Sequence, residues 1–127
     1  MTIHIEKVFN CDAEVLWSIV GTPDRVDWVP GVHACEFDGE VRRFDMPGAG
    51  QIMEKILERD EEKKFIAYSC IESPVPLNSH RATIEIQENE AGCLMIWETE
   101  VDPVAVETFI EQSMQGCLSQ IETLIAV

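Results

Sequence analysis

Glu54, Tyr68 and His80 are the side chains of this sequence whose chemistry could serve a reaction or hold a polar ligand. A carboxylate in an apolar interior costs several kcal/mol unless it is paired, hydrogen-bonded or protonated. An inward Glu54 would therefore indicate a ligand site, a proton-transfer site or a buried network, with His80 and Tyr68 as its natural partners. The alternative places Glu54 on the solvent side beside Lys55 as ordinary surface charge. If Glu54 is buried for function, Glu54→Leu should raise the melting temperature.

The alternation of apolar and polar residues indicates which side chains face the interior. His80 alternates with apolar residues along 78–87, and Trp97 lies on the side opposite two glutamates along 93–101. The charged sides must meet water, so we expect His80 and Trp97 to point inward. A histidine whose ring is hydrogen-bonded within the protein and a tryptophan that packs in the core, without contact to a ligand, fit the same pattern. Along 51–59 two inward faces stay open, one with Ile52, Glu54 and Ile56 and the other with Met53, Lys55 and Leu57.

These strands need a surface to pack against, and the last quarter of the chain supplies it. Apolar residues recur at steps of three or four through 102–127, which is the period of an amphipathic helix with a broad apolar face. Asp102 can cap the first turn and Pro103 fits the first helical position, so we expect the helix to begin there, with a length of about 36 Å. Its apolar face includes Val106, Phe109, Ile110, Met114, Cys117, Leu118, Ile121, Leu124 and Ile125.

The preceding residues predict mostly strands. Residues 2–9 alternate as a first strand, a short apolar helix ends at Gly21, and a second short helix is expected at 25–28. The period then changes to two, and an Asp-Gly pair at 38–39 indicates a hairpin. We expect six further strands, over 32–37, 40–45, 51–59, 64–71, 78–87 and 93–101. Residues 1–127 thus indicate a single α+β domain in which a curved antiparallel sheet grips the terminal helix.

Composition narrows the classes of function. Nine Lys and Arg side chains against 24 Asp and Glu give a formal net charge of −15, which repels nucleic acid and anionic membrane surfaces. The five cysteines form no CxxC pair and the three histidines lack metal-site spacing, so we expect no disulfide framework, no metal and no cofactor. No apolar run approaches about 20 residues and no signal-peptide pattern opens the chain. We expect a cytoplasmic protein without membrane insertion, as a monomer or homodimer.

Several loose motifs in a fixed order resemble the START/Bet v 1-like (SRPBCC) superfamily, and in particular its bacterial polyketide cyclase/dehydrase and lipid-transport group. The similarity covers nearly the whole chain. The motifs are Asp12-Ala-Glu-Val-Leu-Trp17, Trp28-Val-Pro30-Gly-Val32, Val41-Arg-Arg43, Pro47-Gly-Ala-Gly50, residues 54–60, Tyr68, Ser73-Pro-Val-Pro76, Ala82 and Trp97.

The resemblance implies a helix-grip fold, in which a bent seven-stranded antiparallel sheet surrounds the long C-terminal helix and two short helices follow the first strand. It also implies a cavity between sheet and helix for a small apolar or amphipathic molecule, with Glu54, Tyr68 and Trp97 directed into it. His80 departs from the pattern, since many relatives carry an aromatic hydroxyl after the proline loop. The superfamily mixes carriers, cyclases, hydrolases and binding modules, so the resemblance alone does not decide the activity.

Three functions follow in order of preference. The first is binding of a small hydrophobic or amphipathic ligand, lipid-like or polyketide-like, in that cavity. The second is a cyclase or dehydratase in which Glu54 or His80 moves a proton, while Tyr68 or Arg43 holds an oxygen. The third is a protein-interaction or stress-related module with a filled core. The expected ligand-contacting residues are Trp28, Arg43, Ile52, Glu54, Ile56, Tyr68, His80, Trp97, Phe109 and Met114. The adjacent positions of Arg42 and Arg43 allow one of them to point inward, although the pattern alone favours a solvated side chain for each.

Overall fold

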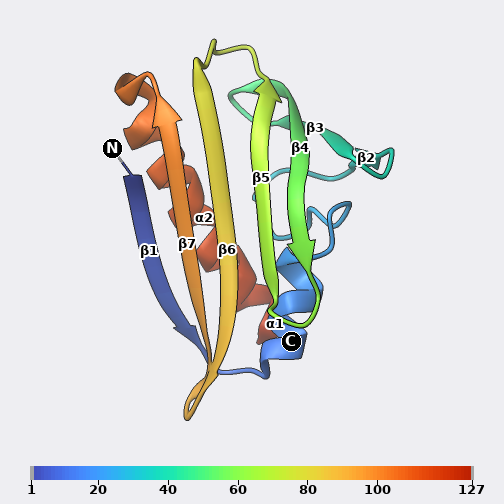
Figure 1. Ribbon diagram of the computed structural model, residues 1–127, viewed down its shortest axis with the longest axis vertical. Helices are drawn as coiled ribbons and strands as arrows, with labels where there is room; N and C mark the ends of the chain where they lie inside the picture. Colours follow the sequence, from blue (N-terminus) through green and yellow to red (C-terminus); the bar gives the residue numbers. More distant parts are fainter. Residues whose placement is uncertain (1, 127) are drawn as a thin grey trace.

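A computed structural model describes residues 2–126 and shows seven strands, one short helix and one long helix (Figure 1). The predicted α+β architecture, a bent antiparallel sheet around a C-terminal helix, is confirmed. The elements are β1 (Thr2–Phe9), α1 (Ala13–Val20), β2 (Glu36–Phe37), β3 (Val41–Met46), β4 (Gly50–Asp60), β5 (Phe65–Glu72), β6 (Ser79–Asn89), β7 (Gly92–Asp102), the 3₁₀ turn η1 (Val104–Val106) and α2 (Glu107–Ile125).

The sheet has the spatial order β1-β7-β6-β5-β4-β3-β2, and every neighbouring pair is antiparallel. Strands β2 to β7 follow one another as hairpins, and β1 joins at the edge beside β7 (Figure 1). At the first hairpin, Asp38 accepts hydrogen bonds from the backbone N–H groups of Glu40 and Val41, and Gly39 has a φ of 100°. The Asp-Gly pair therefore makes the turn that its sequence predicts.

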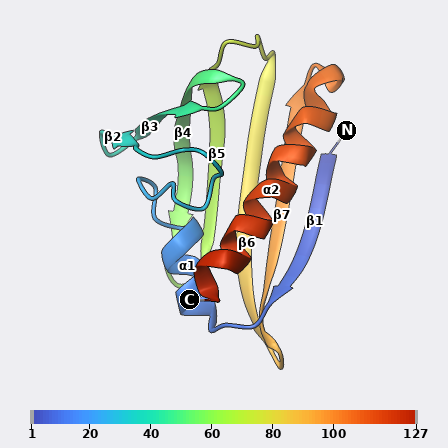
Figure 2. The ribbon, with the colours of Figure 1, turned by 180° about the vertical axis from the view of Figure 1, so that it is seen from behind.

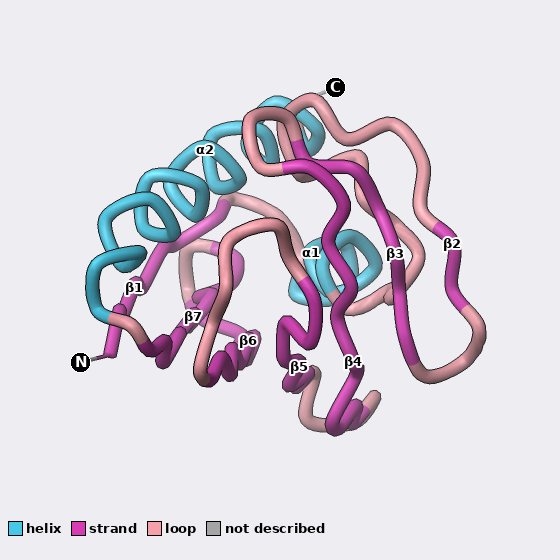
Figure 3. The backbone as a smooth tube through the Cα atoms, turned by 90° about the horizontal axis from the view of Figure 1, so that it is seen from above, coloured by secondary structure: helices cyan, strands magenta, loops and turns pink. Residues whose placement is uncertain are grey.

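Helix α2 packs on one face of the sheet, over β6 and β7 (Figure 2). Its residues Met114, Leu118 and Ile121 are buried and belong to one core cluster with Ile84 and Met95 of these strands. Seen from above, the sheet curves from β1 round to β2, and α1 with the loop after it lies inside the curve (Figure 3). The core is thus packed where α2 meets β6 and β7.

The long helix begins later than predicted. Asp102 does not cap it, because β7 stays paired with β6 as far as Asp102 and the Asp102 carbonyl accepts the Asn78 N–H at 2.7 Å. The chain then makes the short turn η1, and α2 starts at Glu107 with a length of about 28 Å. No helix within residues 2–126 is both long and apolar enough to cross a bilayer.

The predicted second short helix at 25–28 is wrong, and the predicted strand at 32–37 is reduced to β2. Between Pro23 and Pro30 the backbone forms only separate turns, closed by the Arg25 N–H on the Thr22 carbonyl and the Val29 N–H on the Val26 carbonyl. Pro30 contributes to this because it has no N–H to donate and disfavours helical backbone at the residue before it. The side chains of this loop still face inward, since Val26, Trp28 and Val29 are buried. The loop therefore supplies packing surface without regular structure.

Two irregularities shape the sheet beside the loop. Strands β5 and β6 pair only from Phe65 to Tyr68 and then separate. Strand β4 shifts register against β5 twice, with Leu57 and Ile71 left out of the pairing. Bulges bend a strand and redirect its side chains, and they are common beside functional sites.

Shortening the most buried side chain of α2 tests this packing. Ile121 has no exposed surface, so Ile121→Ala should lower the free energy of unfolding by about 2–5 kcal/mol. Ser119→Ala, on the exposed face of α2, should change it by no more than about 0.5 kcal/mol. Urea denaturation of both variants provides the comparison, and equal stabilities would contradict the packing described.

Candidate functional site

A cavity of about 410 Å³ lies between the curved sheet, the first half of α2 and the loops after α1 and β5. This volume is within the range of small-molecule sites in proteins. The residues that line it are mostly apolar: Val26, Trp28, Val29, Arg42, Phe44, Met46, Gly48, Ala49, Ile52, Glu54, Tyr68, Cys70, Ser73, Pro74, Val75, Leu77, His80, Trp97, Thr99, Ala105, Val106, Phe109, Ile110, Ser113, Met114 and Cys117.

The loop after β5 and the start of α2 each contribute a half-exposed apolar side chain to the lining. Val75 in that loop is 47% exposed, and Phe109 on the first turns of α2 is 49% exposed. Their aromatic and aliphatic side chains lie at the edge of the lining, while Met114, further along the helix, is buried. The cavity therefore runs from an exposed apolar rim to a buried inner wall.

An ion pair occupies the inner wall. Arg42 of β3 lies directly opposite Glu54 of β4, and its Nε donates to Glu54 Oε1 at 2.8 Å. The two side chains are only 4% and 13% exposed. Because neighbouring residues on one face of a sheet are separated by two positions, this register puts Arg42 inside and Arg43 outside.

The Arg42 guanidinium is held on its other sides as well. Its Nη1 donates to the carbonyl of Pro23 at 3.2 Å, and its Cζ lies 4.8 Å from the centre of the Tyr68 ring. Burial disfavours the charge of Arg42, but Glu54, Tyr68 and Cys35 together outweigh it, so the pKa of Arg42 is raised. Glu54 balances the charge of this guanidinium, and hydrogen bonds are recorded for two of its three nitrogens, Nε and Nη1.

Tyr68 connects the ion pair to two tryptophans. Trp97 Nε1 donates to the Tyr68 hydroxyl at 3.2 Å, and the Trp97 and Trp28 rings are 5.7 Å apart. Trp28 is anchored in turn, since its Nε1 donates to the Arg25 carbonyl at 3.0 Å. Burial, with Glu54 adding to it, raises the pKa of Tyr68, so the phenol stays protonated. Its hydroxyl accepts from Trp97 and keeps its own hydrogen for donation.

His80 stands where β5 and β6 separate. The backbone N–H of Cys70 donates to His80 Nδ1 at 2.9 Å, which replaces a hydrogen bond of the interrupted ladder. Because Nδ1 accepts this hydrogen bond, the neutral imidazole ring carries its proton on Nε2. Burial lowers the pKa of His80 below 6.5, against a smaller opposing effect of Glu54, so the ring is neutral at neutral pH.

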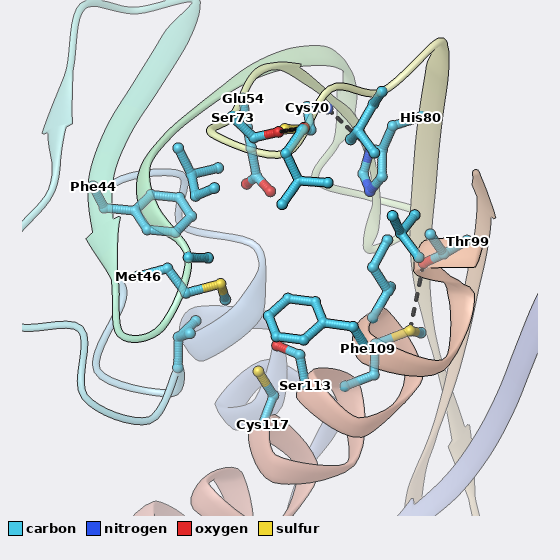
Figure 4. Close-up of a pocket in the computed structure, with 18 of the residues that line it drawn as sticks. Phe44, Met46, Glu54, Cys70, Ser73, His80, Thr99, Phe109, Ser113 and Cys117 are labelled. Atoms are coloured by element: carbon cyan, nitrogen blue, oxygen red, sulfur yellow. Dashed lines mark hydrogen bonds between the residues drawn. The ribbon is translucent and has the colours of Figure 1, made fainter. Parts of the chain in front are cut away.

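Two polar side chains, Glu54 and His80, point into the apolar space (Figure 4). The Glu54 carboxylate enters from β4 and the His80 ring from β6, with the Nε2 edge of His80 turned away from its bond to Cys70. Among residues 2–126, no hydrogen bond is found to Glu54 Oε2 or His80 Nε2, and none joins the two side chains. With the Tyr68 hydroxyl hydrogen, Glu54 Oε2 and His80 Nε2–H are thus polar groups of the lining that remain available.

The cysteines in the lining are not activated. Burial raises the pKa of Cys117 to about 12, with Glu54 as a smaller cause, and burial also raises the pKa of Cys70. Both thiols therefore stay protonated at neutral pH and are poor nucleophiles.

Most of the expected ligand-contacting residues come together in this lining, and two do not. Trp28, Ile52, Glu54, Tyr68, His80, Trp97, Phe109 and Met114 all line the cavity. Arg43 pairs with Glu36 and Met53 on the ladder and does not line it, because the β3 register turns its neighbour Arg42 inward. Ile56 lies two residues beyond Glu54, opposite Tyr68 and next to the bulge at Leu57, and packs against the core cluster instead.

Three parts of the site were missed from the sequence. Arg42 was named only as the alternative to Arg43, although its cross-strand distance to Glu54 makes it the partner of the carboxylate. Thr99, whose hydroxyl donates to Met114 Sδ at 3.6 Å, shares the strand face of Trp97, and the alternation along 93–101 contained that signal. The loop of residues 73–77 carries no pattern that places it over a cavity.

A bent antiparallel sheet that holds a C-terminal helix over an apolar cavity defines the helix-grip, Bet v 1-like class of proteins. The chain belongs to the polyketide cyclase / dehydrase and lipid transport family, whose model matches residues 1–126. The resemblance seen in the motifs is therefore confirmed.

Solved structures share the fold over nearly the whole chain. A putative uncharacterized protein from Bacillus thuringiensis superposes with a TM-score of 0.84 at 22% identity, covering 100% of this chain and 98% of its own. Protein XoxI from Bacillus cereus gives a TM-score of 0.84 at 21% identity, with coverages of 98% and 93%. Ara h 8.0201 gives 0.80 at 16% identity, with coverages of 99% and 97%. No curated protein matches the chain.

The ion pair reverses the sequence-based expectation for Glu54→Leu. Leucine would leave Arg42 charged and unpaired in a buried position, so we expect this variant to lose about 3–5 kcal/mol of unfolding free energy. The double variant Arg42→Met/Glu54→Leu removes both charges and should regain most of that loss. Denaturant titrations close the double-mutant cycle, and additive losses would show that the two side chains do not depend on each other.

His80 predicts a pH dependence of stability. Its pKa is lowered in the folded state, so the unfolded chain binds the proton more readily and stability falls as the pH drops below 6.5. His80→Asn keeps an acceptor for Cys70 and removes the titration. The melting temperature of the native protein should therefore fall relative to this variant between about pH 7 and pH 5. Parallel curves over that range would show that His80 does not contribute as described.

Proposed function

We propose that this protein binds a small hydrophobic or amphipathic molecule, lipid-like or polyketide-like, in the cavity between the sheet and α2. The observation that carries the proposal is the orientation of the Arg42–Glu54 pair, whose carboxylate faces an apolar space of about 410 Å³. An interaction module with a filled core, the third function considered, has no use for such a space.

The energetics of the pair support this proposal. Two charges at 4% and 13% exposure lose much of their hydration, and apolar side chains of similar volume commonly stabilise such a position equally well or better. A charge pair here contributes fixed polarity to the wall of the cavity. Apolar sites with a few well-placed polar groups are typical of small-molecule binding, because the apolar surface supplies affinity and the polar groups fix orientation.

The availability of Glu54 Oε2 and His80 Nε2 to the same space favours a second candidate function. A neutral histidine and a carboxylate on opposite sides of a bound carbonyl compound could move protons in a cyclisation or dehydration, which typically contributes about 10²–10⁴-fold in rate. Tyr68 would donate to the substrate oxygen. The family name includes both cyclases or dehydrases and lipid transport, so turnover of a bound compound distinguishes the two functions.

Filling the cavity tests the binding function directly. Ser113 is half-buried in the lining, so Ser113→Phe should place a ring in the ligand space and weaken binding of the neutral probe N-phenylnaphthylamine by about tenfold or more. The measurement is a fluorescence titration of the probe at constant protein concentration.

Ser119→Phe is the matched control, because it makes the same change on the exposed face of α2. It should leave the affinity for the probe unchanged. Equal affinities of the native protein and both variants would place the probe outside the cavity and contradict the proposed function.

A further inference from the structure

The charges around the cavity limit the kind of ligand that its inner end can accept. Within the lining described, Arg42 and Glu54 are the only residues with ionised side chains, and they neutralise each other at 2.8 Å. A charged group placed beside them would be buried without a counter-ion, which is strongly unfavourable in an apolar site. A ligand's buried end should therefore be uncharged.

A carboxylate is the least suitable of the common polar groups. Glu54 faces the space, whereas the charge of the Arg42 guanidinium is already balanced by Glu54, and the guanidinium also contacts the Pro23 carbonyl and the face of Tyr68. A ligand carboxylate would meet Glu54 as a like charge and find no free cation. The net charge of −15 on the whole chain opposes anions further.

A hydroxyl group fits the polar groups that remain available. Glu54 Oε2 has no hydrogen-bond partner within residues 2–126 and can accept one bond, while the Nε2–H of neutral His80 and the Tyr68 hydroxyl can each donate one. An alcohol or phenol can donate to the carboxylate through its hydrogen and accept from a donor through its oxygen. The hydrogen bond to an ionised carboxylate is also stronger than one between neutral groups.

We propose that the cavity selects neutral ligands that carry a hydroxyl group at their buried end, an alcohol or phenol on an apolar body, and rejects molecules that present a carboxylate there. This selectivity rests on the proposed binding function and adds the chemical class of the ligand. Glu54 sets the preference by accepting the hydroxyl hydrogen, and the neutral donors of the lining, His80 and Tyr68, suit an uncharged oxygen.

A series of probes with one hydrocarbon body separates these effects. Naphthalene, naphthol, naphthoate and naphthylmethylammonium differ only in the polar group, and calorimetry or quenching of tryptophan fluorescence gives their affinities at neutral pH. We expect naphthol to bind about tenfold tighter than naphthalene and about 100-fold tighter than naphthoate, with the ammonium probe also weaker than naphthol. Naphthoate binding as tightly as naphthol would overturn the inference.

The variant Glu54→Gln tests which residue is responsible. It removes the negative charge and leaves Arg42 without its counter-ion, so naphthoate should gain about tenfold in affinity while naphthol loses affinity. Glu58→Gln makes the same change at an exposed position of β4 and should leave all four affinities unchanged. An unchanged order of the probes in Glu54→Gln would contradict the role of Glu54. If Glu54→Gln does not fold, the order of the four probe affinities measured on the native protein still tests the selectivity.

Failure of the inference differs from failure of the proposed function. If naphthalene binds and Ser113→Phe weakens it, the cavity is a ligand site whatever the order of the polar probes. If none of the four probes binds, or Ser113→Phe changes none of them, the cavity does not act as a ligand site and both proposals are wrong.

Discussion

Two opposite charges held away from water have to stay together, and in this protein that constraint organises one wall of a cavity. Arg42 and Glu54 come from different strands, so their 2.8 Å contact requires the observed register of β3 and β4. The Tyr68 ring lies against the guanidinium, and Trp97 donates to the Tyr68 hydroxyl. A chain of contacts thus extends from β3 to β7 across the sheet. These residues, Arg42, Glu54, Tyr68 and Trp97, form a polar wall in which each side chain contacts the next.

The rest of the fold keeps an open space in front of this wall. Helix α2 fills the concave side over β6 and β7, where Ile84, Met95 and Ile121 are fully buried. Toward β3 and β4 the sheet curves away, and the loops after α1 and β5 contribute to the lining of the space. The separation of β5 from β6 frees a backbone N–H, and His80 accepts it. The same irregularity therefore satisfies the backbone and positions a donor over the cavity.

The architecture could be predicted because strand and helix periods are local properties of the sequence. The site was only partly predictable, because it depends on pairing between distant residues. Parity along 51–59 left the orientation of Glu54 open, since apolar residues occur on both faces and Leu57 lies in a bulge. Arg42 could not be separated from Arg43 without the register of β3 on β4. The capping signal at Asp102 was overridden by the pairing of β7 with β6.

The central claim is that a small molecule occupies the space between the polar wall and α2, and the three tryptophans report on it independently. Trp28 and Trp97 line the cavity, whereas Trp17 is buried in α1 and donates to Glu61. Each indole N–H gives its own signal in a proton–nitrogen NMR correlation spectrum. Titration with naphthol should shift the signals of Trp28 and Trp97 to saturation and leave that of Trp17 in place. Saturable shifts confined to Trp17, or none at Trp97, would contradict the claim.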